Sequence, residues 1–208
     1  MKKVQYRKNR KGFTLAELLI TVAITVILAS FGFVSVSGYQ RRLKLTEMDN
    51  TAREIFIAAQ NHLTSSEASG SWNSVFQTDA AESDFGVKVS ASTLGISDSS
   101  DDYRAILSTR GKEPSDGDYA TAWNEILPYG SITESVRTEG QYIVIYNASS
   151  ASVYGVLYTD NSSNAFGSVN SEFSFDLSKL SEYLELVQKT QNERVSYESG
   201  NGHVYIGW

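Results

Sequence analysis

The segment FTLAELLITVAITVILASFGFV, residues 13–34, decides how the rest of the chain is organised. Its 22 residues contain a single charged side chain, Glu17. As a helix that rises about 1.5 Å per residue, the segment is about 33 Å long, which exceeds the roughly 30 Å hydrocarbon core of a bilayer. The sequence therefore predicts a helix that spans a membrane once.

The residues before this segment, MKKVQYRKNRKG, contain six of the 18 Lys and Arg residues and no acid. The flank of a span that carries the excess of basic residues stays in the cytoplasm, so we expect the bulk of the chain on the other side of the membrane. A secretory signal peptide is the alternative, but its apolar region is only about 7–15 residues long and ends in a small-residue cleavage site. The longer apolar run, with a poor site near Ala29 and Ser30, argues against it.

The rest of the chain is acidic, with 12 basic residues against 24 acidic ones after residue 12. Such a surface repels phosphate, so we expect no general nucleic-acid binding. A local basic patch around Arg41, Arg42 and Lys44 is better explained as a collar that flanks an apolar helix. The chain has no cysteine and two histidines, which excludes disulfides, thiolate metal sites and metal sites with three histidines.

Glu17 lies near the cytoplasmic end of the apolar segment, and two interpretations of it are open. Thr14 and Glu17 match the S/T-x-x-E capping box, in which the two residues satisfy free backbone groups at the start of a helix. Alternatively, Glu17 forms an ion pair within an assembly. If the chain were cut between Gly12 and Phe13, a new ammonium group at Phe13 would attract the carboxylate of a neighbouring copy, because lipid screens charges weakly.

The sequence KGFTLAELL, residues 11–19, resembles the class III signal and cleavage site of type IV prepilins and pseudopilins. The resemblance covers roughly residues 7–65. It combines a short basic leader, Gly before the cut, Phe after it, Glu at the fifth mature position and an unbroken apolar helix. It implies that prepilin peptidase cuts between Gly12 and Phe13, that Phe13 is N-methylated, and that Glu17 pairs with the Phe13 amine of an adjacent subunit.

Beyond the apolar segment, hydrophobic residues recur every three or four positions, which predicts one buried face of a continuing helix. These residues are Leu45, Met48, Ala52, Ile55, Ala59 and Leu63. The helix is expected to run from about Thr14 to about Ser66, with Gly70 as a stop signal and His62 at the edge of the core. The chain thus divides into a leader (1–12), a transmembrane and assembly helix (13–38), its amphipathic continuation (39–66) and a globular head (67–208).

The second half of the head carries strong strand patterns. Residues 141–147 and 152–159 predict an antiparallel hairpin, a further strand is expected within 166–175, and RVSY and HVYIGW flank a Gly-rich turn as a second hairpin. Two helices are also expected. One is a short helix after Asp118 that buries Trp123, Ile126 and Leu127, and the other follows Asp176 with a stripe of Leu177, Leu180, Tyr183, Leu184 and Val187. The predicted fold is α+β, with an antiparallel sheet of four or five strands packed on the first helix, as in pilins.

No pattern of an enzyme is present, and we expect no catalytic residue, cofactor or metal. The acidic loops Asp98-Ser-Ser-Asp101-Asp102 and Asp116-Gly-Asp118 contain oxygen ligands suitable for Ca²⁺ but lack EF-hand spacing, so solvated carboxylates are the better explanation. The sequence contains no nucleophile elbow, P-loop, dinucleotide fingerprint or zinc-protease motif.

The resemblance implies a structural subunit of a type IV pilus-like filament, polymerised through its N-terminal helices. Its expected partners are copies of itself or other pilins, prepilin peptidase, the pilus assembly machinery and the membrane. The chain would lie in the cytoplasmic membrane with its head outside, then in a cell-surface pilus or fibre. The alternatives are a pseudopilin of a type II secretion or DNA-uptake machine and a membrane-anchored adhesin that never polymerises. The lack of cysteines departs from the many pilins with a C-terminal disulfide and favours a Gram-positive system.

Overall fold

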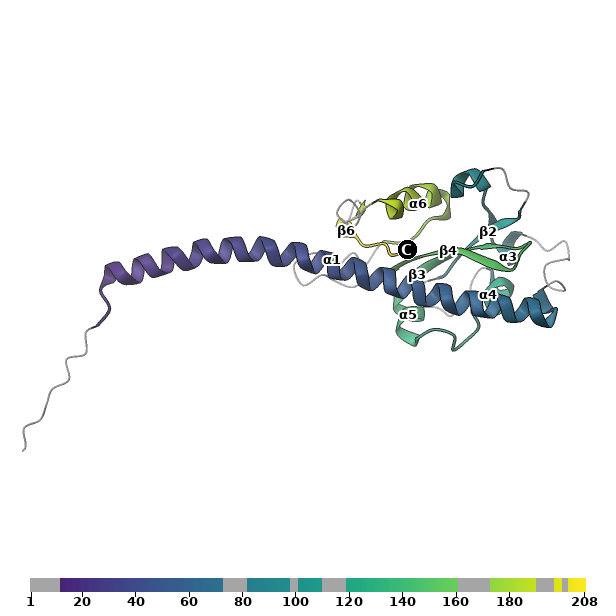
Figure 1. The fold of residues 1–208 in the computed structure, drawn as a ribbon, viewed down its shortest axis with the longest axis horizontal. Helices are drawn as coiled ribbons and strands as arrows, with labels where there is room; N and C mark the ends of the chain where they lie inside the picture. Colours follow the sequence, from purple (N-terminus) through teal and green to yellow (C-terminus); the bar gives the residue numbers. More distant parts are fainter. Residues whose placement is uncertain are drawn as a thin grey trace, which may run out of the picture. The chain divides into compact units, whose positions relative to one another are not determined.

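The computed structural model divides the chain into two compact units, Met1–Gln40 and Arg41–Trp208. One element, the helix α1 (Leu15–Ser69), contributes to both units (Figure 1). The structure describes residues 12–72, 82–97, 101–109, 119–160, 173–189, 197–199 and 202–208.

Helix α1 confirms the long N-terminal helix that the sequence predicts. All six residues of the expected stripe are at most 1% exposed. The helix ends at Ser69, three residues beyond the expected end. Gly70 follows with φ of 76°, a left-handed conformation that glycine adopts without steric cost, and its N–H donates to the carbonyl of Glu67 at 3.0 Å.

The head contains a four-stranded antiparallel sheet in the order β1-β2-β3-β4. The expected hairpin is confirmed as β3 (Gly140–Asn147) and β4 (Ser152–Asp160). Strand β2 (Tyr103–Leu107) pairs with the other edge of β3, and the short β1 (Val87–Lys88) pairs with β2. The sequence predicted neither β1 nor β2. Both lie in the part of the chain where Ser, Asp and Gly obscure the strand pattern.

Strand β3 is buried on both faces, and its alternating side chains enter two different cores. Tyr142, Val144 and Tyr146 belong to the core that also contains the α1 stripe. Ile143 and Ile145 point into the second core, which lies on the opposite face of the sheet. The sheet is therefore the central layer of the head.

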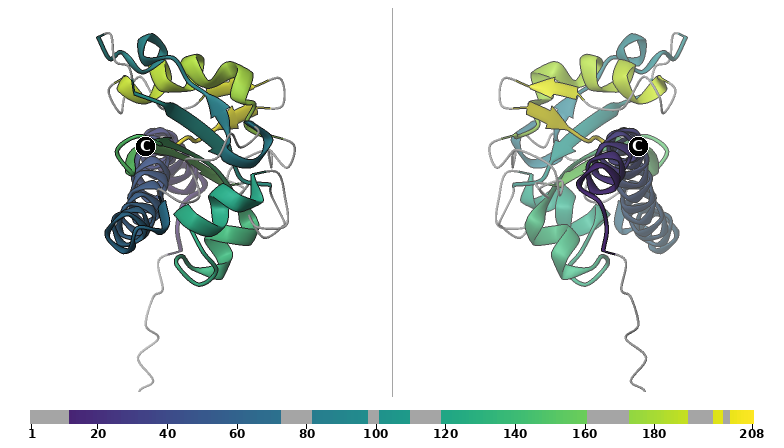
Figure 2. Two further views of the ribbon diagram at one scale, coloured as in Figure 1. Left: turned by 90° about the vertical axis from the view of Figure 1, so that its right-hand side faces the viewer. Right: turned by 90° about the vertical axis from the view of Figure 1, so that its left-hand side faces the viewer.

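Short helices cover the two faces of this sheet. On the α1 face, α4 (Ala120–Ile126) buries Trp123 and Ile126 as predicted, with Leu127 after its last turn, and α5 (Glu134–Glu139) leads into β3. On the other face, η3 (Leu177–Lys179) and α6 (Leu180–Gln188) cover the second core. Figure 2 shows α6, in yellow-green, and the teal α4–α5 pair on opposite sides of the sheet. The remaining helical segments are α3 (Glu82–Phe85) and η1 (Ala91–Leu94).

The α6 stripe is also confirmed, because Leu180, Tyr183, Leu184 and Val187 are all buried, while Leu177 packs against them partly exposed. Two expectations fall outside the described part of the chain. Asp118, expected as the N-cap of the helix over 120–126, is one of them, and the N-cap position of that helix is instead occupied by Tyr119. The other is most of the strand expected over 166–175, of which the structure describes only 173–175, and these residues belong to no strand.

The second hairpin is confirmed as β5 (Tyr197–Ser199) paired with β6 (Gly202–Val204). The prediction that its second strand continues through residue 208 is wrong. Gly207 instead exchanges two backbone hydrogen bonds with Tyr158 of β4, at 2.8 and 3.1 Å, and the N–H of Trp208 donates to Asp49 at 3.0 Å. Gly207 allows this path because a Cβ there would lie 2.2 Å from the backbone of Met48.

Candidate functional site

The expected cleavage point precedes the first helical residue. Gly12, Phe13 and Thr14 lie outside any helix, and α1 begins at Leu15. Phe13 is 84% exposed, and nothing lies within 4 Å of the position that a Cβ on Gly12 would take. The peptide bond between Gly12 and Phe13 is therefore in an exposed, non-helical stretch, where a peptidase can reach the backbone.

Thr14 and Glu17 form the capping box that the sequence suggested. Oε2 of Glu17 accepts hydrogen bonds from the backbone nitrogen of Thr14 at 2.9 Å and from its Oγ1 at 2.9 Å. In return, the backbone N–H of Glu17 donates to Oγ1 of Thr14 at 3.3 Å. A carboxylate in the first helical turn is also favoured by the helix dipole. The first interpretation of Glu17 is thus confirmed within one chain, while pairing between copies stays a prediction.

The first half of α1 exposes apolar side chains on all sides. Each of the following is more than half exposed: Leu15, Leu18, Leu19, Ile20, Val22, Ile24, Val26, Ile27, Leu28 and Phe31. Such a surface is far more apolar than a free soluble helix allows and requires a covering. No helix in the described part of the chain meets the length and hydropathy needed to cross a membrane.

The hydroxyl groups of Thr21, Thr25 and Ser30 have partners in their own helix. Thr21 donates to the carbonyl of Leu18 at 2.9 Å, Thr25 donates to that of Thr21 at 2.9 Å, and Ser30 donates to that of Val26 at 2.7 Å. These hydrogen bonds satisfy the hydroxyl protons without water. The helix thus presents an apolar surface in spite of its Thr and Ser content.

The expected basic patch after this half is smaller than predicted. Nζ of Lys44 pairs with Asp160 at 2.9 Å and with Glu47 at 3.1 Å, so the charge of Lys44 is neutralised inside the head. Partial burial lowers the pKa of Lys44, but the hydrogen bonds and charges of the two carboxylates outweigh it and hold that pKa above its ordinary value. Arg41 and Arg42 remain, and both are exposed.

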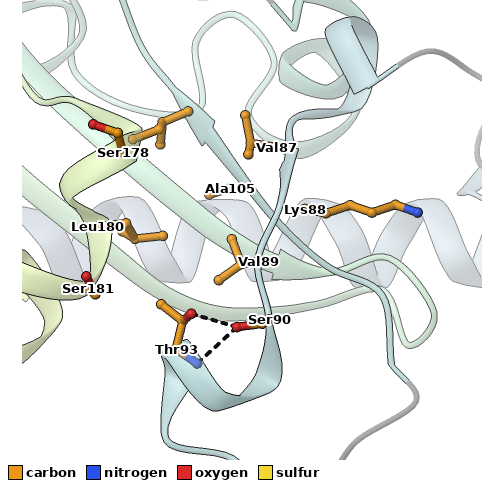
Figure 3. A pocket seen from close by; sticks show the side chains of 10 residues that line it. Val87, Lys88, Val89, Ser90, Thr93, Ala105, Ser178, Leu180 and Ser181 are labelled. Atoms are coloured by element: carbon orange, nitrogen blue, oxygen red, sulfur yellow. Dashed lines mark hydrogen bonds between the residues drawn. The ribbon is translucent and has the colours of Figure 1, made fainter.

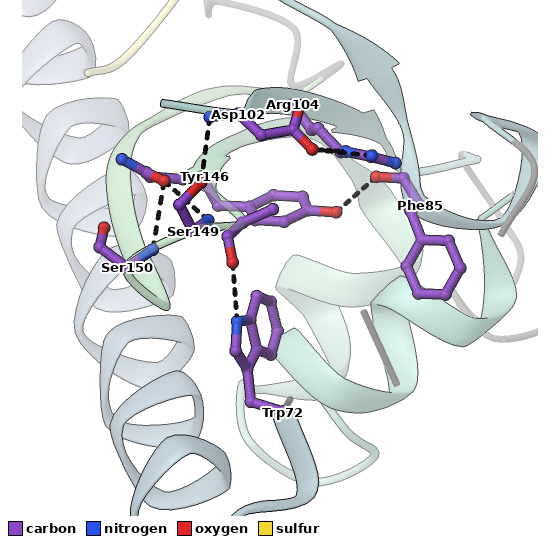
Figure 4. Close-up of polar contacts among 9 residues, drawn as sticks. Trp72, Phe85, Asp102, Arg104, Tyr146, Ser149 and Ser150 are labelled. Carbon is purple, nitrogen blue, oxygen red and sulfur yellow. Dashed lines mark hydrogen bonds and ion pairs between the residues drawn. The ribbon is translucent and has the colours of Figure 1, made fainter. Parts of the chain in front are cut away.

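A second polar cluster, which the sequence did not reveal, joins the segment after α1 and the end of α3 to the β3–β4 hairpin (Figure 4). Nε1 of Trp72 donates to the carbonyl of Ala148 in the β3–β4 turn at 3.0 Å. The hydroxyl of Tyr146 donates to the carbonyl of Phe85. Burial raises the pKa of Tyr146, which keeps the hydroxyl protonated and able to donate. These contacts stabilise the fold of the head and do not point to a catalytic role.

The acidic loops do not form a metal site in the described part of the chain. Asp102 forms an ion pair with Arg104 at 2.8 Å, while Asp98, Asp116 and Asp118 lie outside the described residues. Among the residues that the structure describes, no three His, Asp or Glu side chains gather as a metal site requires. His62 is half-buried at the edge of the core, as expected, and the side chain of His203 is not among those described.

A pocket of about 330 Å³ lies between β1, η1 and α6 (Figure 3). Apart from Lys88, its lining consists of apolar and hydroxyl side chains. The side chain of Lys88 extends away from the others in Figure 3. Ser90 uses its hydroxyl to cap η1, where it accepts from the N–H of Thr93 at 3.3 Å. This lining contains no pair of groups suited to acid–base or nucleophilic chemistry.

A family model described as the prokaryotic N-terminal methylation motif matches residues 7–33. This match covers residues 7–12 of the expected leader, the exposed Gly12–Phe13 bond, the capping box and the apolar residues of α1 as far as residue 33. No solved structure matches the chain. The motif implies a precursor that is anchored in the membrane and exported, with processing by prepilin peptidase.

Proposed function

We propose that this chain, which carries the class III signal of type IV pilin-like proteins on an α+β, pilin-like fold, is a structural subunit of a type IV pilus-like filament. Proteins with this signal are generally structural rather than catalytic. The observation that carries the proposal is the match over residues 7–33, which coincides with an accessible Gly12–Phe13 bond and with the start of α1.

Cleavage would change the charge of the N-terminal region in a way that favours assembly. Removal of residues 1–12 takes away all six basic side chains that precede the apolar segment. It creates an ammonium group at Phe13, and residues 13–40 then carry only this charge and the Glu17 carboxylate. Those six charges then no longer have to cross the hydrocarbon core when the subunit moves outward into a filament, which lowers the free-energy cost of that movement.

Glu17 and Phe13 would set the register between neighbouring subunits. Two opposite charges attract each other about four times more strongly at an effective dielectric constant of 20 than in water. An ammonium group from an adjacent Phe13 would therefore be drawn to the Glu17 carboxylate in the lipid-like interior of a filament. The apolar side chains of residues 15–31 would pack against those of neighbouring helices and lose their exposure to lipid.

The test is the intact mass of the protein in filaments sheared from cells that express it with its native assembly genes. We expect a species that begins at Phe13 and carries one added methyl group in the sheared extracellular fraction. A processed species confined to the membrane fraction would instead identify a pseudopilin or a minor subunit. An uncut chain that begins at Met1 would contradict the proposal and leave only a membrane anchor.

A further inference from the structure

Arg41 and Arg42 are the first basic residues after the cleavage point, since residues 13–40 contain neither Lys nor Arg. Both side chains are exposed on α1, and neither forms an ion pair with the residues that the structure describes. Their neighbour Lys44 is already neutralised by Asp160 and Glu47. The two guanidinium groups are thus an unused pair of positive charges on a chain that is otherwise acidic.

The position of this pair along α1 matches the thickness of a bilayer. Arg41 lies 26 residues after Leu15, the first residue of α1, and a continuous helix covers about 39 Å over that length. A bilayer with its headgroup layers is about 40–45 Å thick. With Phe13 at the cytoplasmic interface, Arg41 and Arg42 reach the headgroup layer of the opposite leaflet.

We propose that Arg41 and Arg42 form a lipid-binding collar that engages the phosphates of anionic phospholipids in the outer leaflet. The guanidinium group suits this role because its planar set of donors binds phosphate oxygens in pairs. The collar would hold each subunit at a fixed depth before assembly, with Glu17 at the level of the Phe13 amine of its neighbours. This proposal rests on the membrane insertion that belongs to the proposed function.

The lack of native cysteine allows a local measurement on the full chain. Gln40→Cys places a single fluorescent label next to the collar, about 40 Å along the helix from the basic leader. The labelled chain is reconstituted in vesicles of phosphatidylcholine with a minor fraction of nitroxide-bearing lipid, either phosphatidylglycerol or phosphatidylcholine. The ratio of quenching by the two nitroxide lipids reports how strongly anionic lipid collects at the collar.

We expect stronger quenching by the anionic lipid. The preference for the anionic lipid, measured as the ratio of the two quenching signals, should fall by about fivefold for each arginine replaced in Arg41→Gln and Arg42→Gln. It should also fall in high salt. Arg53→Gln is the matched control, because Arg53 is exposed on the same helix but lies 12 residues, or about 18 Å, farther from the membrane. The preference in this variant should equal that of the wild type.

Three results would contradict the proposal that Arg41 and Arg42 form a lipid-binding collar. One is equal quenching by both lipids in the wild type, and another is an equal loss of preference in Arg53→Gln. The third is a double variant that keeps its lipid preference but no longer assembles, which would assign the arginines to contacts with a second copy. Absence of quenching by either lipid would mean that residue 40 is not at the headgroup layer, a result that contradicts the proposed membrane insertion itself.

Discussion

Glu17 is joined to Thr14 by hydrogen bonds of 2.9 Å from both the backbone nitrogen and Oγ1 of the threonine. The same carboxylate is the group proposed to attract the Phe13 amine of a neighbouring subunit. Capping requires only an acceptor on the side chain, whereas pairing with an ammonium group requires the negative charge. The two roles can therefore be separated by substitution.

Glu17→Gln should insert into the membrane and keep a capped helix but fail to form filaments. Glutamine supplies the acceptor of a capping box without the charge. Glu17→Ala, which loses both properties, should fail in the same way. Filament yield after shearing is the measurement, and Glu54→Gln, which removes an exposed acid farther along α1, is the control. Normal filaments from Glu17→Gln would show that only the cap matters.

Thr14→Ala should loosen the first turn of α1. The substitution removes the Oγ1 that donates to Glu17 and accepts from its N–H, and loss of such a cap costs about 1 kcal/mol. Amide hydrogen exchange at residues 17 and 18, measured on the full chain in detergent micelles, should become faster. Thr14→Ser retains the hydroxyl and should exchange like the wild type. Unchanged exchange in Thr14→Ala would rule out a contribution of the hydroxyl to the cap.

Asp176 should make the stability of the head depend on pH in the acidic range. Its carboxylate accepts from the N–H of Ser178 at 2.9 Å, and the hydrogen bonds from Ser178 hold the pKa of Asp176 below its ordinary value. A group with a lowered pKa in the folded state stabilises it above the unfolded pKa, about 3.9 for Asp, and this contribution is lost as the pH falls through the folded pKa.

The comparison is between the wild type and Asp176→Ala, unfolded in urea and followed by tryptophan fluorescence. The wild type should be the more stable protein at pH 7, and the difference should shrink as the pH falls toward about 2, because the protonated carboxyl keeps only a neutral acceptor. Asp176→Asn keeps an acceptor that does not titrate, so its advantage over alanine should not change with pH. A wild-type advantage that is equally large at both pH values would show that the carboxylate charge is not involved.

Gly207→Ala should destabilise the head by about 1–3 kcal/mol, the usual range for an overpacked core. The added Cβ would lie 2.2 Å from both the carbonyl carbon and the oxygen of Met48, and this backbone can move only with α1. The urea midpoint of the full chain is the measurement. Gly38→Ala is the control because nothing lies within 4 Å of its added Cβ. A midpoint equal to that of the wild type would mean that residues 205–208 do not contribute to stability.

The features predicted correctly from the sequence are those in which the interacting residues are close along the chain. The stripe of α1 repeats every three or four residues, and Thr14 caps a residue only three positions away. The β3–β4 hairpin joins two strands through a four-residue turn. In each of these cases, the geometry of one helix or one turn determines which side chains meet.

The features that the sequence did not reveal depend on residues far apart in the chain. Lys44 was expected to be part of a basic patch, but its charge is neutralised by Asp160, a residue 116 positions away. Tyr146 reaches the carbonyl of Phe85 across 61 positions. Strands β1 and β2 were missed because their short, polar surroundings carry little periodicity, and their place is determined by pairing with β3.

The sequence by itself therefore determined the basic N-terminal segment, the apolar segment with its one carboxylate, the long helix and the α+β class of the head. Charge, hydropathy and helical periodicity are properties of neighbouring residues, and they act before any tertiary contact forms. Only the tertiary structure decided that Lys44 is neutralised, that Arg41 and Arg42 are left exposed, and that Gly207 lies against the backbone of Met48. These outcomes depend on the path by which the sheet brings distant segments back to α1, and local preferences do not specify that path.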